Sequence, residues 1–308
     1  MGDKIIVFLL LTTVVIGSVF LWFVYIRQYR FATLLFDLLP FYPILVLLGL
    51  VTSIICIVLL VNEGDLTLLL SILVLMNYVV QFTLFWRWFS SYRLKNYSKF
   101  LQKLANTSKI RVISVIEWLD QPQKDPSAIL VLIRHDIDIN LVRAKKMLSE
   151  EKKHNISSCN YFRNNAERYS FNQAKKIIKD IAKTGQSTIG FHYESIRNAN
   201  GDISKAKKLF SKEIEEFRLI YPIRMVAAHG DRYRNRRLVS EKLVDLKSLN
   251  LESSYFLPHD YYLSDAGGFH HFSYLNNKKE TIMEKLQILD EIALGSLVQI
   301  LIHPDWWF

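Results

Sequence analysis

The chain has 308 residues, half of them hydrophobic, and a formal net charge of +10. This composition excludes a disordered chain and is sufficient for a membrane region together with one packed domain, or at most two. With only two cysteines, Cys56 and Cys159, neither a disulfide framework nor a thiolate zinc cluster can form. Residues 1–89 carry four basic and four acidic side chains, so the excess positive charge lies in residues 90–308. A basic domain suggests anionic lipid head groups or phosphorylated substrates as partners, and no motif indicates nucleic acid.

Three apolar segments without charged residues occupy the N-terminal region. They are residues 5–26, 43–62 and 66–86. Each is long enough to cross a hydrocarbon core of roughly 30 Å. We therefore expect three transmembrane helices within residues 1–89 and an integral, multi-pass membrane protein.

The charges that flank these segments predict their orientation. Two arginines follow the first segment, whereas only acidic charges follow the second. The third is followed by Arg87, Arg93, Lys95, Lys99 and Lys103. Basic flanks favour the cytoplasmic side, so the C-terminal domain is expected in the cytoplasm. Residues 90–125 are interpreted as a basic juxtamembrane segment that ends in a linker over 112–125.

Short apolar runs alternate with amphipathic ones in residues 126–308. Strands are expected at 129–134, 157–162, 187–192, 223–228 and 297–302. Helices are expected at 140–153, 171–184, 203–219 and 236–248. This alternation predicts βαβ units around a parallel sheet, either open or closed as a barrel. In both forms the chemistry gathers where strands end and loops begin.

Polar residues stand at four of these expected strand ends. Asp136 and Asp138 point to one face of their strand, and two adjacent carboxylates repel unless a cation lies between them or one is protonated. His192, His229 and His303 end three other strands. Any one of these residues alone is compatible with a structural role. Together they predict a mononuclear metal site with acid and base partners.

The order of four motifs, HDID, GFHYE, AHG and LIHPDWW, resembles the polysaccharide deacetylases, the NodB-like fold of carbohydrate esterase family 4. The resemblance covers roughly residues 126–308. It implies a distorted (β/α) barrel that removes acyl groups from N-acylated amino sugars with one divalent metal ion, often zinc. It also implies that Asp136 is the catalytic base, that Asp138 and His192 bind the metal, and that His303 protonates the leaving amine.

The sequence departs from the family pattern at the second metal-binding histidine. Ile196 stands where that histidine is expected, four residues after His192. His229 is the best substitute as third ligand because it ends another strand; the alternative is that it only bonds to the backbone. Glu194 is the next candidate. A histidine at position 196 would be expected to add a ligand.

The substrate and its contacts are less well defined by the sequence. Arg134, Trp306 and Asp265 are predicted to contact it, and Asp265 is alternatively the acidic residue that, by the resemblance, orients its partners. The expected activity is hydrolysis of an N-acetyl or N-formyl group on a lipid-linked or polymeric glycan, such as a polyprenyl-phosphate-linked amino sugar. With the opposite orientation, a surface polysaccharide or peptidoglycan is expected. Two alternatives remain open: a metal-free deacetylase fold that binds glycan or acts as a scaffold, and a glycosyltransferase or phosphatase that uses the DxD motif.

Overall fold

The structure is a computed structural model that describes residues 75–76, 79, 93–229, 243–265 and 289–307. The chain divides into two compact units, Met1–Ser90 and Ser91–Phe308. Within the described residues, no helix has the length and apolar character needed to cross a bilayer. The three predicted spans lie outside the described residues, apart from positions 75, 76 and 79 of the third, and they stay predictions.

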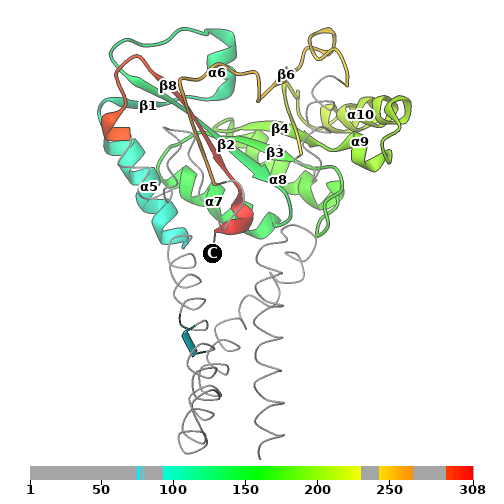
Figure 1. Ribbon diagram of the computed structural model, residues 1–308, viewed down its shortest axis with the longest axis horizontal. Coiled ribbons are helices and arrows are strands. Elements are labelled where there is room, and N and C mark those ends of the chain that lie inside the picture. Colours follow the sequence, from blue (N-terminus) through cyan, green and yellow to red (C-terminus); the bar gives the residue numbers. More distant parts are fainter. Residues whose placement is uncertain (1–74, 77–78, 80–92, 230–242, 266–288, 308) are drawn as a thin grey trace, which may run out of the picture. The chain divides into compact units, whose positions relative to one another are not determined.

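A parallel sheet forms the centre of the C-terminal unit (Figure 1). Its spatial order is β6-β5-β4-β3-β2-β8-β7, and β1 pairs with the first part of β2. All pairs are parallel, and the sheet is strongly curled into a half-barrel. The strands are β1 Ile110–Val112, β2 Ile129–Ile137, β3 Cys159–Phe162, β4 Thr188–Tyr193, β5 Met225–Ala228, β6 Glu252–Ser253, β7 Tyr261–Ser264 and β8 Leu297–Ile302. The predicted α/β class with a parallel sheet is confirmed.

Helices connect successive strands from β2 to β5. They are α7 Leu141–Lys153, α8 Phe171–Thr184, α9 Ser195–Asn198 and α10 Ile203–Arg218. The capping residues explain where they start and stop: the Asn140 side chain accepts from two backbone N–H groups of α7, and Gly185, with φ +65°, ends α8. The helix expected at 236–248 falls partly outside the described residues, and its end contains the short 3₁₀ helix η2, Lys247–Leu249.

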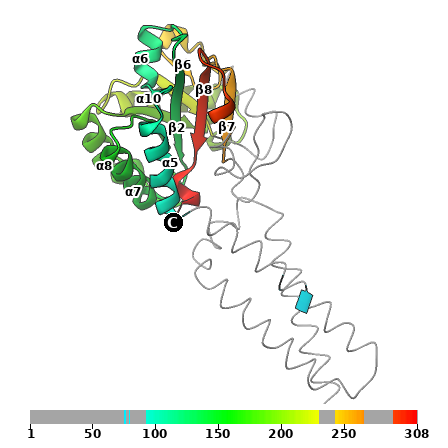
Figure 2. The ribbon, with the colours of Figure 1, turned by 90° about the vertical axis from the view of Figure 1, so that its left-hand side faces the viewer.

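The two faces of the sheet bury separate hydrophobic cores. On the outer face, Phe162 and Phe191 pack with side chains from α8 and α10, such as Phe210. Figure 2 shows α8 and α10 on the same side of the sheet. On the inner face, Leu130, Leu132 and Tyr161 pack with residues of α6, Val115–Asp120, including Trp118. The inner face therefore has an apolar core under α6, and the charged and imidazole side chains gather on it towards the carboxyl ends of the strands.

The segment before β2 differs from the expected juxtamembrane segment and linker. Helix α5, Leu94–Asn106, buries Tyr97, Phe100, Leu101 and Leu104 against the unit. Strand β1 joins the sheet beside β2, and α6 covers the inner core. A strand of three residues and a helix of six are too short to produce a clear hydrophobic period in the sequence. Residues 94–120 are thus part of the fold.

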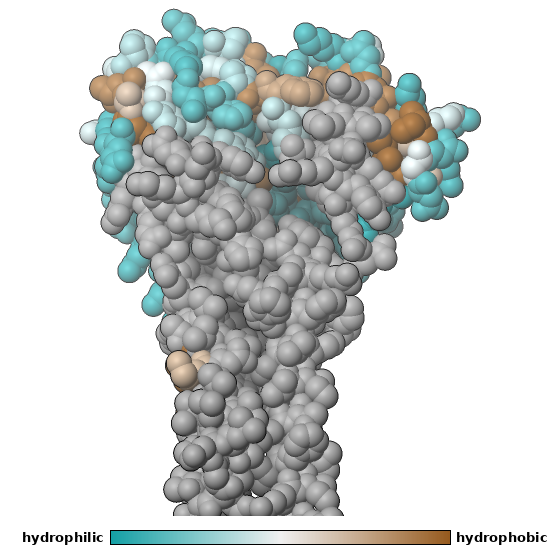
Figure 3. All heavy atoms as spheres, in the orientation of Figure 1, coloured by the Kyte–Doolittle hydropathy of each residue, from teal (hydrophilic) through white to brown (hydrophobic). Residues whose placement is uncertain are grey.

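The described surface of this unit is mainly hydrophilic in the view of Figure 3, with smaller hydrophobic areas. The large hydrophobic side chains that are exposed on the described part of the unit come from several elements and loops: Val142, Ile203, Leu219, Phe256 and Leu294. Single exposed side chains of this kind are normal on folded proteins.

Candidate metal centre

Charged or imidazole side chains directly follow six of the parallel strands. They are Asp138 after β2, Arg163 after β3, Glu194 after β4, His229 after β5, Asp265 after β7 and His303 after β8. Because the strands are parallel, their carboxyl ends meet at one edge of the sheet. The His229 N–H donates to the Tyr193 carbonyl at 2.7 Å, which extends the β4–β5 pairing and fixes the position of this histidine. The topology therefore gathers these residues around one centre.

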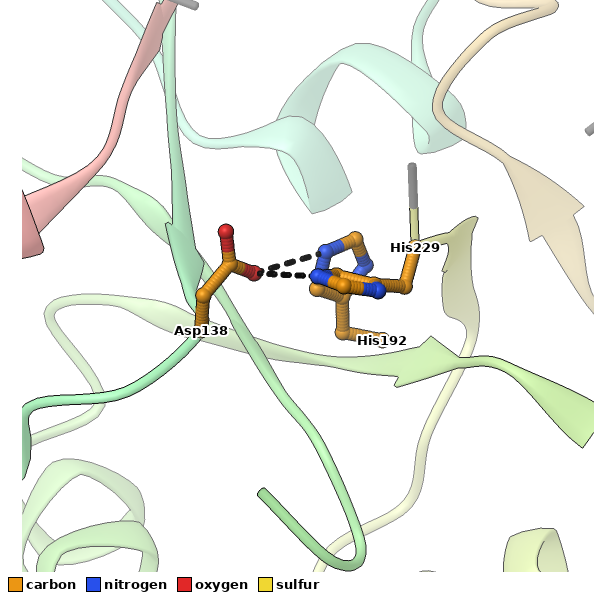
Figure 4. Close-up of side chains that lie close together, drawn as sticks. All are labelled: Asp138, His192 and His229. Atoms are coloured by element: carbon orange, nitrogen blue, oxygen red, sulfur yellow. Dashed lines mark ion pairs between the residues drawn. The ribbon is translucent and has the colours of Figure 1, made fainter. Parts of the chain in front are cut away.

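Asp138, His192 and His229 form a compact group at this edge (Figure 4). The Asp138 Oδ1 atom lies 3.1 Å from His192 Nε2 and 3.4 Å from His229 Nε2. The two imidazole rings are 5.0 Å apart and nearly perpendicular, at 82°. Ligand atoms about 2.0–2.1 Å from a tetrahedral metal lie roughly 3.3 Å from one another. The spacing around Asp138 therefore matches a metal site, as the sequence predicted for these three residues.

The hydrogen bonds of the group also fit a bound cation. Asp138 Oδ1 is buried and makes no hydrogen bond among the described residues; the two imidazole Nε2 atoms lie near it at ion-pair distance, and a metal ion between the three atoms would satisfy the carboxylate. His192 Nδ1 lies 3.0 Å from the Ala227 carbonyl, so this nitrogen carries the proton and donates it. Its Nε2 lone pair is then directed at Asp138 and is available to a metal. One carboxylate and two imidazoles suit several divalent metals, so the ligands leave the metal's identity open.

Electrostatics couple His229 to Asp138. Burial disfavours the charged forms of both groups, but each stabilises the charge of the other. As a result the pKa of His229 is raised to about 9, and the pKa of Asp138 is held well below its usual value. Because a metal binds only neutral imidazole, its binding would displace the proton that the raised pKa of His229 favours.

Asp136 lies beside this group and is paired with Arg134. Arg134 Nε and Nη2 donate to the two Asp136 oxygens at 2.7 Å each. The rings of Tyr161 and Tyr255 lie 5.0 and 4.7 Å from the guanidinium and hold it in place. Gly190 makes room for this arrangement, since a Cβ there would lie 2.4 Å from the Tyr161 ring. Burial raises the pKa of Asp136, but Arg134 together with the nearby His192 and His303 outweighs it and the net pKa is lowered, so Asp136 is an ionised carboxylate suited to act as a base.

Asp265 fixes His303, which also lies near Asp136. Asp265 accepts from His303 Nδ1 at 2.6 Å, from the His303 backbone N–H at 3.0 Å and from Trp307 Nε1 at 3.2 Å. Burial disfavours the imidazolium, but the Asp265 carboxylate, together with Asp138 and Asp136, outweighs it and raises the pKa of His303 to about 10. His303 Nε2 lies 4.0 Å from Asp136 Oδ2. A protonated His303 therefore stands within reach of the same reacting centre as the base.

Two of the predicted substrate contacts have other partners in the structure. Arg134 is buried and pairs with Asp136, and Asp265 is fully buried and orients His303. For Asp265 this agrees with the alternative role that the sequence suggested. Trp306 belongs to the 3₁₀ helix η3, Pro304–Trp306, but its side chain lies outside the described residues.

The position of Ile196 in the fold explains why a histidine is not needed there. It lies in α9 and is buried in the outer hydrophobic core with residues of α10, such as Phe210. Its side chain therefore belongs to the opposite side of the sheet from the inner face that carries His192. The expectation that a histidine at position 196 would add a ligand is wrong for this fold, and His229 lies close to Asp138 instead.

We expect Ile196→His to destabilise the domain and leave the metal affinity unchanged. The substitution buries a polar ring without a partner and removes apolar contacts, which costs roughly 2–4 kcal/mol. Thermal unfolding and metal titration of the same preparation measure both effects. Ile196→Val is the matched control, with an expected cost of about 0.5–1.5 kcal/mol. A tighter metal site in the histidine variant would contradict this placement.

Arg163 and Asp305 are site residues that the sequence interpretation missed. Arg163 Nη1 donates to the Asp138 carbonyl at 2.9 Å and pairs with Glu194. Asp305 Oδ2 accepts from the backbone N–H groups of Asp138 and Ile139, both at 3.1 Å, and burial together with Asp138 raises its pKa to about 7. Both residues lie just past strands, so the signal that identified the histidines was present for them too.

A scan against models of known protein families found no match, and a search of curated proteins found no similar sequence. What the fold and the site define is a class: an all-parallel, curled α/β half-barrel with a buried Asp/His/His group that could hold a metal ion. This class is consistent with a metal-dependent enzyme.

Proposed function

We propose that this chain is a metal-dependent deacylase that hydrolyses the N-acetyl or N-formyl group of an amino sugar in a lipid-linked or polymeric glycan. One observation carries the proposal: a carboxylate and an imidazolium, each held by its own buried partner, stand beside a group of metal-ligand type. The order of motifs that resembles the NodB-like polysaccharide deacetylases supports the same activity. In this proposal the half-barrel corresponds to the distorted (β/α) barrel of that family.

The residues divide the work of amide hydrolysis among them. Asp138, His192 and His229 would hold the metal, which supplies Lewis-acid polarisation of the acyl carbonyl and lowers the pKa of a water molecule. Asp136 accepts a proton from the attacking water, and Arg134 keeps this carboxylate ionised and correctly oriented. Once the water oxygen has bonded to the acyl carbon, His303 Nε2 donates its proton to the amide nitrogen, and the C–N bond breaks to give a carboxylic acid and a free amine. Asp265 binds Nδ1 and so presents Nε2 to the reaction.

The location and the substrate are part of the proposal. If the predicted spans and their orientation hold, the active site lies at the cytoplasmic face of the membrane. An amino sugar on a polyprenyl phosphate carrier then fits best, because the excess positive charge of residues 90–308 suits a phosphorylated substrate. The reverse orientation would make a surface polysaccharide or peptidoglycan the substrate.

The proposal is tested by release of amine and acid from defined substrates. The full chain, purified in detergent, is incubated with N-acetyl and N-formyl amino-sugar oligomers and with a polyprenyl-phosphate-linked amino sugar. We expect equimolar free amine and acetate or formate, loss of activity with a chelator, and recovery when a divalent metal is added. Glycan binding without product and without bound metal would overturn the proposal and favour a metal-free binding subunit.

A further inference from the structure

Glu194 lies behind His229, on the side of the ring away from Asp138. His229 Nδ1 is 3.3 Å from Glu194 Oε2 and Nε2 is 3.4 Å from Asp138 Oδ1; both are ion-pair distances, and Nδ1 is buried with no aligned hydrogen bond among the described residues, so Glu194 is the carboxylate placed to satisfy it. The ring thus lies between two carboxylates, one at each nitrogen. The side chains of His229 and Glu194 are both at least nine-tenths buried, so water has little access to compete for these nitrogens.

Two arginines hold the Glu194 carboxylate. Arg163 pairs with Oε1, and Arg197 lies 2.9 Å from Oε2. Arg163 also donates to the Asp138 carbonyl at 2.9 Å. One buried guanidinium therefore ties the backbone of the first metal ligand to the carboxylate behind the third. This connection spans the ends of β2, β3 and β4.

We propose that Glu194 is a positioning residue that orients His229 as a metal ligand, and that Arg163 fixes Glu194 for this task. A carboxylate at Nδ1 selects the tautomer with its proton on that nitrogen, which leaves the Nε2 lone pair for the metal. It also makes the imidazole a stronger donor to the metal. In this arrangement His229, oriented by Glu194, is the third ligand in place of a histidine at position 196. The side chain at position 196 is buried in the outer core because it belongs to α9.

The inference deepens the proposed function and rests on its metal centre. Its test uses Co²⁺ binding to the full chain, without substrate, so it does not depend on deacylase activity. If the wild type binds Co²⁺ but deacylates nothing, only the proposed function fails. If the wild type does not bind Co²⁺, the inference fails together with the metal centre.

The decisive variant is Glu194→Gln, which keeps the shape of the side chain and removes its charge. Loss of such a carboxylate behind a metal-bound histidine typically weakens metal binding by about 10–100-fold, and we expect a Co²⁺ Kd raised within this range. Glu167→Gln is the matched control: Glu167 also pairs with Arg163 and Arg197 but is more exposed, and among the described residues no ion pair joins it directly to a metal ligand. Its Kd should stay within about twofold of wild type. Thermal unfolding confirms that each variant is folded.

The absorption spectrum of bound Co²⁺ separates positioning from direct ligation. At saturating Co²⁺, the Glu194→Gln protein should show the wild-type visible spectrum per bound ion, because the three ligands are unchanged. A different band shape or intensity would mean that Glu194 itself binds the metal and would overturn the positioning role. An unchanged Kd in a folded Glu194→Gln protein would also overturn it. Glu194→Ala gives a second reading should the glutamine variant not fold, with the same expectations for Kd and spectrum.

Discussion

Replacement of His229 by alanine should abolish stoichiometric metal in the purified protein. The Nε2 atom of His229 lies 3.4 Å from Asp138 Oδ1, and with His192 it completes a set of three ligands. Protein sites for zinc normally offer three or four ligands, and a two-ligand site would bind the metal poorly. The same loss is expected for Asp138→Ala and His192→Ala. Metal content by inductively coupled plasma mass spectrometry gives the result directly.

His259→Ala is the matched control for this experiment. His259 is exposed and its Nδ1 contacts only the Leu257 carbonyl among the described residues at 3.0 Å, away from the candidate metal ligands. This variant should keep the wild-type metal content. If His229→Ala kept full metal and full activity, the third ligand would have to be another residue, and the assignment of His229 would be wrong.

Asp136→Asn and His303→Ala should each reduce turnover by roughly 10²–10⁴-fold, the range for a positioned proton-transfer group. Neither residue belongs to the proposed ligand set, so metal content should remain near wild type. The Arg134 pair keeps Asp136 ionised, and the Asp265 contact keeps His303 protonated, so each substitution removes one defined proton transfer. Turnover on an N-acyl amino sugar, metal content and thermal unfolding are measured on one preparation.

The pH profile of turnover assigns the two roles. Asp136 has a lowered pKa, so the base is lost only when acid protonates it, and this produces the acidic limb. His303 has a pKa raised to about 10, so the acid is lost as the pH rises through that region, and this produces the alkaline limb. The Asp136 variant should lack the first limb and the His303 variant the second. An unstable His303→Ala protein with wild-type turnover per folded molecule would remove His303 from the mechanism.

The sequence was sufficient to predict the site residues that lie at the carboxyl ends of the strands. Apolar runs followed by Asp138, His192, His229 and His303 identify strands and their carboxyl ends, and parallel pairing brings these ends together. The alternation of side chains along β2 also places Asp136 and Asp138 on one face. The bounds of α8 agree with the predicted 171–184 because its capping residues and its apolar period both mark them.

The partners of these residues could not be predicted in the same way. Arg134 pairs with Asp136 while its guanidinium lies against the rings of Tyr161 and Tyr255. These two residues come from distant parts of the chain, so the sequence around Arg134 does not reveal this arrangement. Whether position 196 faces the metal or the core depends on how α9 leaves β4, and no periodic pattern records the direction of a four-residue helix. Short elements such as β1 likewise join the sheet through contacts that only the folded chain makes.

X-ray diffraction at the absorption edge of the bound metal tests the central claim most directly. Crystals of the full chain should show one anomalous peak at the carboxyl edge of the sheet. Its ion should lie about 2.0–2.2 Å from an Asp138 oxygen and from Nε2 of His192 and His229. An ion bound without His229, or no ion between these three residues at saturating metal, would contradict the account.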